Sequence, residues 1–164
     1  MSGQDSNLPS NHLWDALPES LRAELETIAI PKHWSPGALI FQEGAEHDDI
    51  YLLLDGHVRL EMLMRDRGRV PVMTVGAGDV VGWSPLFGGH PMTATAMVLE
   101  PTHALAFDGK HLRELCAANH ELGYHVMRHI AITLSERLLA TRLQLLDMFR
   151  EHEPRPSRAV DAEC

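Results

Sequence analysis

The 164-residue sequence has few cysteines, few aromatic residues and no long apolar run. Its two cysteines, Cys116 and Cys164, are too far apart in sequence for a Cys-x-x-Cys metal or redox motif and too few for a disulfide framework. No stretch reaches the roughly 18 apolar residues of a membrane span, and residues 1–11 lack the basic start and apolar run of a signal peptide. We therefore expect a cytoplasmic protein with an aliphatic core and no membrane association.

Basic residues and catalytic motifs are also scarce. Lys and Arg number 14 against 23 Asp and Glu, which gives a net charge of −9. Phosphate backbones repel such a chain unless its cations cluster on one face. The sequence has no Gly-x-Ser-x-Gly elbow, no phosphate-binding Gly-x-x-x-x-Gly-Lys loop and no evident catalytic carboxylate pair. These absences argue against DNA binding and against an enzyme.

The sequence divides into stretches that differ in the spacing of their apolar residues. Residues 1–16 are a polar lead-in, and Leu17–Ile28 has apolar residues at helical spacing, which predicts one short helix with Pro18 in its first turn. From about residue 36 to 107, short apolar runs alternate with glycine turns, which is typical of a mainly β fold, either an antiparallel barrel or roll or a flat sandwich. The expected strands are Ala38–Phe41, Ile50–Leu54, Val58–Met64, Val70–Val75, Val80–Gly82, Thr93–Leu99 and His103–Phe107.

Helical periodicity returns after Asp108. Lys110–Ala117 predicts a short helix and residues 121–149 one long helix, followed by a tail over residues 150–164. Apolar residues at alternating spacings of four and three indicate a coiled-coil seam, hence a homodimer, although a helix buried in its own domain would also explain them. A second apolar stripe, formed by Leu139, Leu143 and Leu146, could pack on the barrel. The seam residues are Met127, Ala131, Leu134, Leu138, Thr141, Leu145 and Met148.

Three motifs in the β region resemble a known family. Pro36–Gly44, Ile50–Leu60 and Gly76–Gly82 are similar to the opening strands and the cassette-leading strand of the cyclic-nucleotide-binding domain of the cAMP receptor protein and fumarate-nitrate regulator superfamily. The resemblance extends from about residue 17 to 149. It implies a jelly-roll-like β-roll, or double-stranded β-helix, with flanking helices and a long C-terminal dimerisation helix.

The sequence departs from that family at the phosphate-binding cassette. Trp83 stands where nucleotide-binding members have a Glu that binds the ribose, and Met92 where they have an Arg that clamps the cyclic phosphate. We therefore expect the module not to sense cAMP or cGMP in the ordinary way. Trp83 and Met92 could instead line an apolar ligand site or fill it. The resemblance implies ligand-site positions at Gly82, Trp83, Ser84, Met92, Thr93, Arg137, Thr141 and Arg142, although Thr141 would serve equally as a seam residue and both arginines as solvated side chains.

Eleven histidines raise one further alternative. His125 and His129 are one helical turn apart and could face one metal ion, and His90 lies in the cassette loop where a haem-sensing relative presents an axial ligand. Solvated helix positions explain the pair more simply. Only 15 residues follow Phe149, too few for a helix-turn-helix domain. We therefore expect a sensory or regulatory module that signals through protein contacts, with a protein-interaction module around a vestigial pocket as the alternative and a haem sensor as a third hypothesis.

Overall fold

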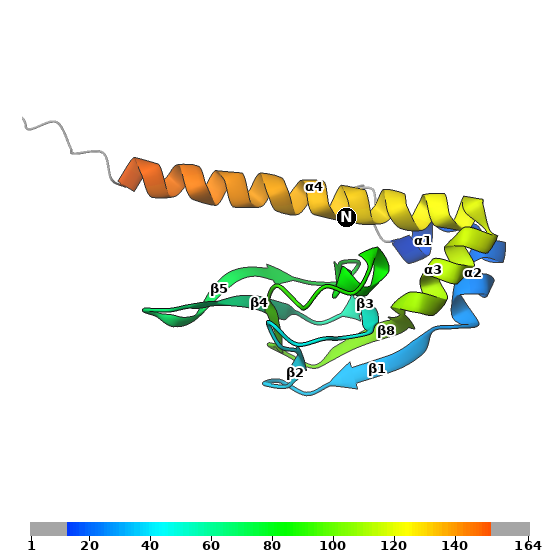
Figure 1. The fold of residues 1–164 in the computed structure, drawn as a ribbon, viewed down its shortest axis with the longest axis horizontal. Coiled ribbons are helices and arrows are strands. Elements are labelled where there is room, and N and C mark those ends of the chain that lie inside the picture. Colours follow the sequence, from blue (N-terminus) through cyan, green and yellow to red (C-terminus); the bar gives the residue numbers. More distant parts are fainter. Residues whose placement is uncertain (1–12, 152–164) are drawn as a thin grey trace, which may run out of the picture. The chain divides into compact units, whose positions relative to one another are not determined.

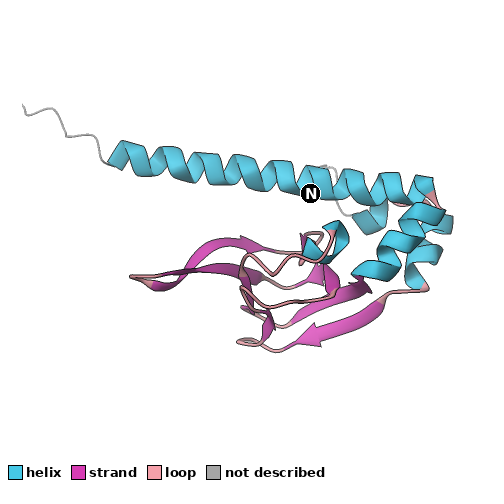
Figure 2. Cartoon of the chain, viewed as in Figure 1, coloured by secondary structure: helices cyan, strands magenta, loops and turns pink. Residues whose placement is uncertain are grey.

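A computed structural model describes residues 13–151, which form two units divided between Ile130 and Ala131. The first unit combines β-strands with helices, as Figure 2 shows. Its elements in chain order are α1 (Leu13–Ala16), α2 (Glu19–Glu26), β1 (Ile30–Trp34), β2 (Leu39–Phe41), β3 (Asp49–Asp55), β4 (Val58–Met64), β5 (Gly68–Val75), β6 (Val80–Val81), the 3₁₀ turn η1 (Ser84–Phe87), β7 (Thr95–Val98), β8 (Thr102–Asp108), α3 (Gly109–Ala118) and the start of α4 (His120–Glu151).

The strands form two antiparallel sheets of four strands each. The first sheet has the order β1-β8-β3-β6 and the second the order β2-β7-β4-β5. Chain neighbours such as β2 and β3 therefore lie in different sheets, as in a jelly-roll-like fold. This arrangement confirms the predicted fold class, with the long helix following the sheets (Figure 1).

The β3 strand separates two hydrophobic clusters, which explains why its sequence is apolar at consecutive positions. Tyr51 and Leu53 point into the roll, where they join a cluster from both sheets. Ile50 and Leu52 point to the opposite face and join a second cluster built from the helices, including Leu122, Val126 and Ile130 of α4. Side chains alternate between the faces of a strand, so a strand buried on both faces must be apolar throughout.

The N-terminal region differs from the prediction in two respects. The helix expected over Leu17–Ile28 is α2, which begins at Glu19 because Pro18 occupies its N-cap with ψ 145°, and an additional short helix, α1, lies in the stretch expected to be a polar lead-in. The strand β1 was not predicted, because four of its five residues are exposed and its sequence has no apolar alternation. It pairs with β8 as an edge strand, where Pro31 is tolerated.

The second unit consists of the α4 helix beyond Ile130. As predicted, a single helix extends over and slightly beyond residues 121–149. Its large apolar side chains are exposed on more than one face, with exposed fractions between 37% and 65% for Leu134, Leu138, Leu139, Leu143, Leu145, Leu146, Met148 and Phe149. A helix with this much uncovered apolar surface is typical of one that binds another chain.

Candidate functional site

The cassette begins at Gly82, whose backbone excludes any larger residue. Its φ is +73°, and a Cβ atom would lie 3.2 Å from both the Asp49 carbonyl oxygen and the Phe41 ring. A side chain here would therefore be strained by conformation and by contact. The glycine allows the chain to turn sharply out of β6 into the cassette.

A short 3₁₀ turn, η1, forms the next part of the cassette. The Trp83 carbonyl accepts a hydrogen bond from the Leu86 amide at 2.9 Å, and the Ser84 carbonyl accepts one from the Gly89 amide at 3.3 Å. Pro85 is buried, and a Cβ atom on Gly109 at the start of α3 would lie only 2.5 Å from its Cβ. The turn is thus held by its own backbone and by close packing on α3.

Met92, which stands where the resembled family has an arginine, is a core residue. Its side chain is 3% exposed and lies in the roll cluster with Phe41, Val81 and Ala96. Its backbone is also fixed: the Met92 amide donates to the Ala45 carbonyl at 3.0 Å, and its own carbonyl accepts from the Gly44 amide at 2.7 Å. Met92 thus packs in the interior of the roll.

The remaining cassette residues are more open. Trp83 and Ser84 are half-buried, and Thr93 is exposed. The structure therefore brings Gly82, Trp83 and Ser84 together at one turn, with Met92 packed in the roll and Thr93 directed toward solvent.

The cassette segment contains no cationic side chain. No Lys or Arg occurs between Arg69 and Lys110. Arg59, on the adjacent strand β4, is already engaged: its Nη2 lies 2.7 Å from the carboxylate of buried Glu61 and 3.4 Å from the Met97 sulfur. An anionic ligand would thus find no uncommitted positive side chain on these strands.

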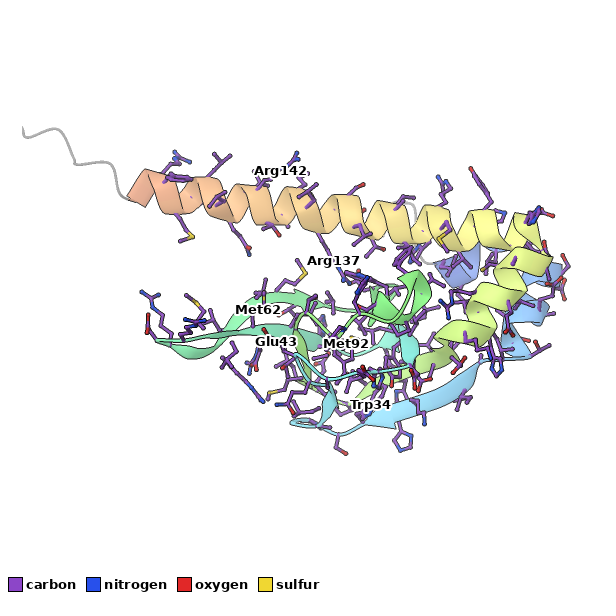
Figure 3. All side chains as sticks on the ribbon, viewed as in Figure 1. Trp34, Glu43, Met62, Met92, Arg137 and Arg142 are labelled. Atoms are coloured by element: carbon purple, nitrogen blue, oxygen red, sulfur yellow. The ribbon has the colours of Figure 1, made fainter. Side chains whose placement is uncertain are left out.

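Sequence reasoning missed a polar cluster on the outer face of the second sheet. The Thr95 hydroxyl oxygen accepts from the Glu43 amide at 3.0 Å, and the Glu43 carboxylate accepts from the Leu63 amide at 2.7 Å. With the Arg59–Glu61 pair, these bonds join β4, β7 and the loop after β2; Figure 3 labels Glu43 near Met92. Strand alternation places Glu61 away from the roll interior, so the sequence carried no signal that it is buried.

The three predicted site residues of the long helix lie in the second unit. The Thr141 hydroxyl donates to the Arg137 carbonyl at 2.9 Å, so its proton is used within the helix backbone. Arg142 is exposed.

One histidine has a different environment from the one expected. His129 is buried at 7% exposed, and its Nε2 donates to the Gly78 carbonyl at 3.0 Å, so the prediction of a solvated position was wrong. This contact ties α4 to the turn before β6. His90 is exposed in the cassette loop. Among residues 13–151, no three His, Cys, Asp or Glu side chains are grouped so as to hold a metal ion.

Two titratable groups of the roll are perturbed. Burial, and next the charge of Asp49, raise the pKa of Tyr51 to about 12, and its hydroxyl lies 2.7 Å from His47 Nε2. A side-chain hydrogen bond from His103, at 2.8 Å, lowers the pKa of Asp55. The Asp55–His103 pair lies at the end of β3, whereas Tyr51 pairs with Val81, the residue before Gly82.

Comparisons with known proteins identify the domain family of the chain. The model of the cyclic nucleotide-binding domain family matches residues 31–119. A CRP-like cAMP-activated global transcriptional regulator from Mycobacterium tuberculosis is 27% identical over 130 residues, which cover 79% of this chain and 54% of that protein. The chain thus spans about half the length of the curated relatives it matches.

Two solved structures share the fold. The N-terminal domain of a transcriptional regulator from Streptomyces coelicolor is 26% identical, with a TM-score of 0.64 and coverage of 78% of this chain and 90% of that one. A cyclic nucleotide-binding domain from Methylobacillus flagellatus is 22% identical, with a TM-score of 0.74 and coverage of 80% and 74%. Across the described part of the chain, no helix is long and apolar enough to cross a membrane.

Proposed function

Because the chain belongs to the cyclic nucleotide-binding domain family, we propose that it is a non-catalytic sensory module whose diverged cassette binds a ligand other than a cyclic nucleotide and which signals through protein contacts. The cassette backbone of the family is present, with its glycine turn and 3₁₀ turn. Where the resemblance expects its charged side chains, the sequence has Trp83 and Met92. The chemistry of the turn therefore suits an uncharged or apolar molecule.

The absence of positive charge in the cassette segment carries this proposal. A cyclic phosphate normally gains a charge-assisted, bidentate contact from arginine. Met92 offers none, and Trp83 cannot accept hydrogen bonds as a carboxylate does. Each lost charged hydrogen bond weakens binding by about 1.5–3 kcal/mol, so two lost bonds weaken cAMP binding by roughly two to four decades.

Calorimetric titration tests the proposal directly. We expect cAMP and cGMP to give no saturable heat with the native chain, and binding in the micromolar range would contradict the proposal. The paired substitution Trp83→Glu and Met92→Arg restores both charged groups and should tighten cAMP binding about 100-fold or more. Trp83→Gln with Met92→Leu is the matched control, because it changes both side chains without adding charge. Because Met92 is a core residue, circular dichroism of each variant should precede titration.

The same proposal includes a homodimer formed by α4. The seam residues Leu138, Leu145 and Met148 are 52%, 52% and 61% exposed. A parallel coiled coil would bury these side chains in both copies. A ligand would then act by favouring one arrangement of the two helices. The free energy by which it shifts the equilibrium would equal the difference between its binding free energies for the two arrangements.

A second candidate function is a protein-interaction module with a filled pocket. The burial of Met92 in the roll favours it, since that side chain occupies interior volume at the expected phosphate position. Native mass spectrometry of the protein purified from its own cells distinguishes the two. A stoichiometric small molecule supports the sensor, whereas a ligand-free dimer whose melting temperature no metabolite changes supports the interaction module.

A further inference from the structure

Two histidines lie side by side on the outer face of the first sheet. His33 of β1 and His103 of β8 are directly opposite each other in an antiparallel ladder, and the two strands are adjacent in Figure 1. Ala104 and Ala106 point into the roll, so by the two-residue period of a strand His103 points outward. Opposite residues of a ladder project on the same face. The ring centroids of the two exposed imidazoles are 6.1 Å apart.

The carboxylate of Asp55 holds one of these rings in place. Asp55 is opposite His103 on the third strand, β3, and its two oxygens lie 2.8 and 3.0 Å from His103 Nδ1. One of them also accepts from the His103 amide at 2.8 Å. An ionised carboxylate can only accept hydrogen bonds, so Nδ1 carries the proton of the neutral ring. The lone pair of His103 is therefore on Nε2.

Protein metal sites orient their histidine ligands in the same way. A metal-binding histidine almost always donates its other ring N–H to a carboxylate, a carbonyl or water, which fixes the tautomer and the direction of the ring. A metal–nitrogen bond of about 2.1 Å, with the ring centroid about 1.1 Å behind the nitrogen, limits the centroid separation of two imidazoles on one ion to about 6.4 Å. The observed separation of His33 and His103 is within this limit.

We propose that His33 and His103 bind a divalent transition-metal ion, with Asp55 as the residue that positions His103. Imidazole suits Zn²⁺, Cu²⁺ and Ni²⁺, whereas Mg²⁺ prefers oxygen ligands. Among residues 13–151 no three His, Cys, Asp or Glu side chains are grouped to hold a metal, so the chain supplies two ligands. Water or a donor from another molecule completes the coordination. The ion is therefore exchangeable, unlike the ion of a closed four-ligand structural site.

A second histidine–carboxylate pair provides the matched control. His57 Nδ1 is hydrogen-bonded to the Glu100 carboxylate, and the His57 side chain is 58% exposed, the same fraction as for His103. His57 lies between β3 and β4 and belongs to neither strand. It has the carboxylate but no imidazole opposite it in a ladder. Its replacement therefore removes an equally exposed, carboxylate-bound histidine without touching the proposed site.

Calorimetric titration of the full chain with ZnCl₂ tests the site. A Cys116→Ala, Cys164→Ala background prevents competition from thiolates. Loss of a ligand should cost at least as much as loss of the group that orients it, so His33→Gln and His103→Gln should each weaken zinc binding about tenfold or more. His57→Gln should leave the affinity unchanged, and MgCl₂ should give no saturable heat. Absence of zinc binding, or equal affinities for all three histidine variants, would overturn the proposal.

NMR of the imidazole nitrogens locates the bound ion. Zinc should shift the ring ¹⁵N signals of His33 and His103 and leave those of His57 in place. If only the signals of other histidines shift, the ion is bound elsewhere and the proposal is wrong. Because none of these residues belongs to the cassette, either result leaves the proposed function as it stands.

The role of Asp55 has a separate test. Asp55→Ala should weaken zinc binding about 10- to 100-fold. Asp55→Asn retains a carbonyl oxygen that accepts from His103 Nδ1, so it should recover part of this affinity. Equal losses in the two variants would show that Asp55 does not act by orienting the ring.

Discussion

Replacement of Leu138 by aspartate tests the α4 seam most directly. Leu138 is 52% exposed in the single chain, so about half of its apolar surface is available to a partner. Full burial of a leucine contributes about 1.5–3 kcal/mol, so burying the remaining half contributes about 1 kcal/mol in each copy. Two aspartates facing each other across the two-fold axis add the cost of desolvating like charges. We expect the dimer to weaken by about 3–5 kcal/mol, or two to four decades in dissociation constant.

Analytical ultracentrifugation over a range of concentrations measures this change. The graded variant Leu138→Ala, which removes apolar surface without adding charge, should weaken the dimer by about 2 kcal/mol in total, one for each copy. His120→Asp is the control for added negative charge, since His120 is exposed at the first turn of α4 and outside the seam. An unchanged dissociation constant for Leu138→Asp would refute the seam assignment.

Circular dichroism gives an independent check on the same variant. A helical segment of about 20 residues that packs on nothing is marginal in water, and α4 beyond Ile130 is mostly exposed. The proposed dimer should therefore stabilise this part of the helix. Leu138→Asp should lose helical signal on dilution, whereas the native chain should retain it while dimeric.

Three further predictions concern the roll. Gly82→Ala should lower stability by clearly more than Gly37→Ala, because both have positive φ but only Gly82 would place its Cβ 3.2 Å from backbone and ring atoms; thermal melts compare them. Met92→Ala should cost about 2–4 kcal/mol in urea unfolding, and a loss below 1 kcal/mol would show that Met92 is not packed in the core. The pKa of Tyr51 is raised to about 12, so the unfolded chain ionises first and stability should fall as pH rises from about 10 to 12; Tyr51→Phe should abolish this fall.

Strands with apolar runs could be predicted from the sequence, because the apolar side chains themselves indicate that the strand is buried. The run Ile50–Leu54 predicted β3 within a residue at either end, and Val58–Met64 matches β4. The sequence of the edge strand β1 has no apolar run, because most of its side chains are exposed to solvent. The strand forms through backbone pairing with β8. Burial of side chains in the core leaves an apolar pattern in the sequence, whereas the backbone pairing of an edge strand leaves none.

The buried polar contacts were hidden for a related reason. Glu61 faces away from the roll on an alternating strand, and only the folded chain shows that Arg59 covers it. His129 occupies a helical position that is equally compatible with solvent, and its partner is a main-chain carbonyl 51 residues away. Long-range contacts with backbone atoms have no residue-type signature, so sequence could not have located them.

The histidine contact connects the turn before β6 to α4. His129 Nε2 donates to the Gly78 carbonyl, and Gly78 precedes the strand β6 that ends at the Gly82 turn. Ile130, the next residue after His129, is the last of the first unit. Under the proposed function, a ligand that displaces β6 or η1 would therefore act on α4 next to the boundary between the two units. Because this link ends on a main-chain carbonyl and uses no cassette side chain, a cassette diverged as proposed would still be able to report an uncharged ligand to α4.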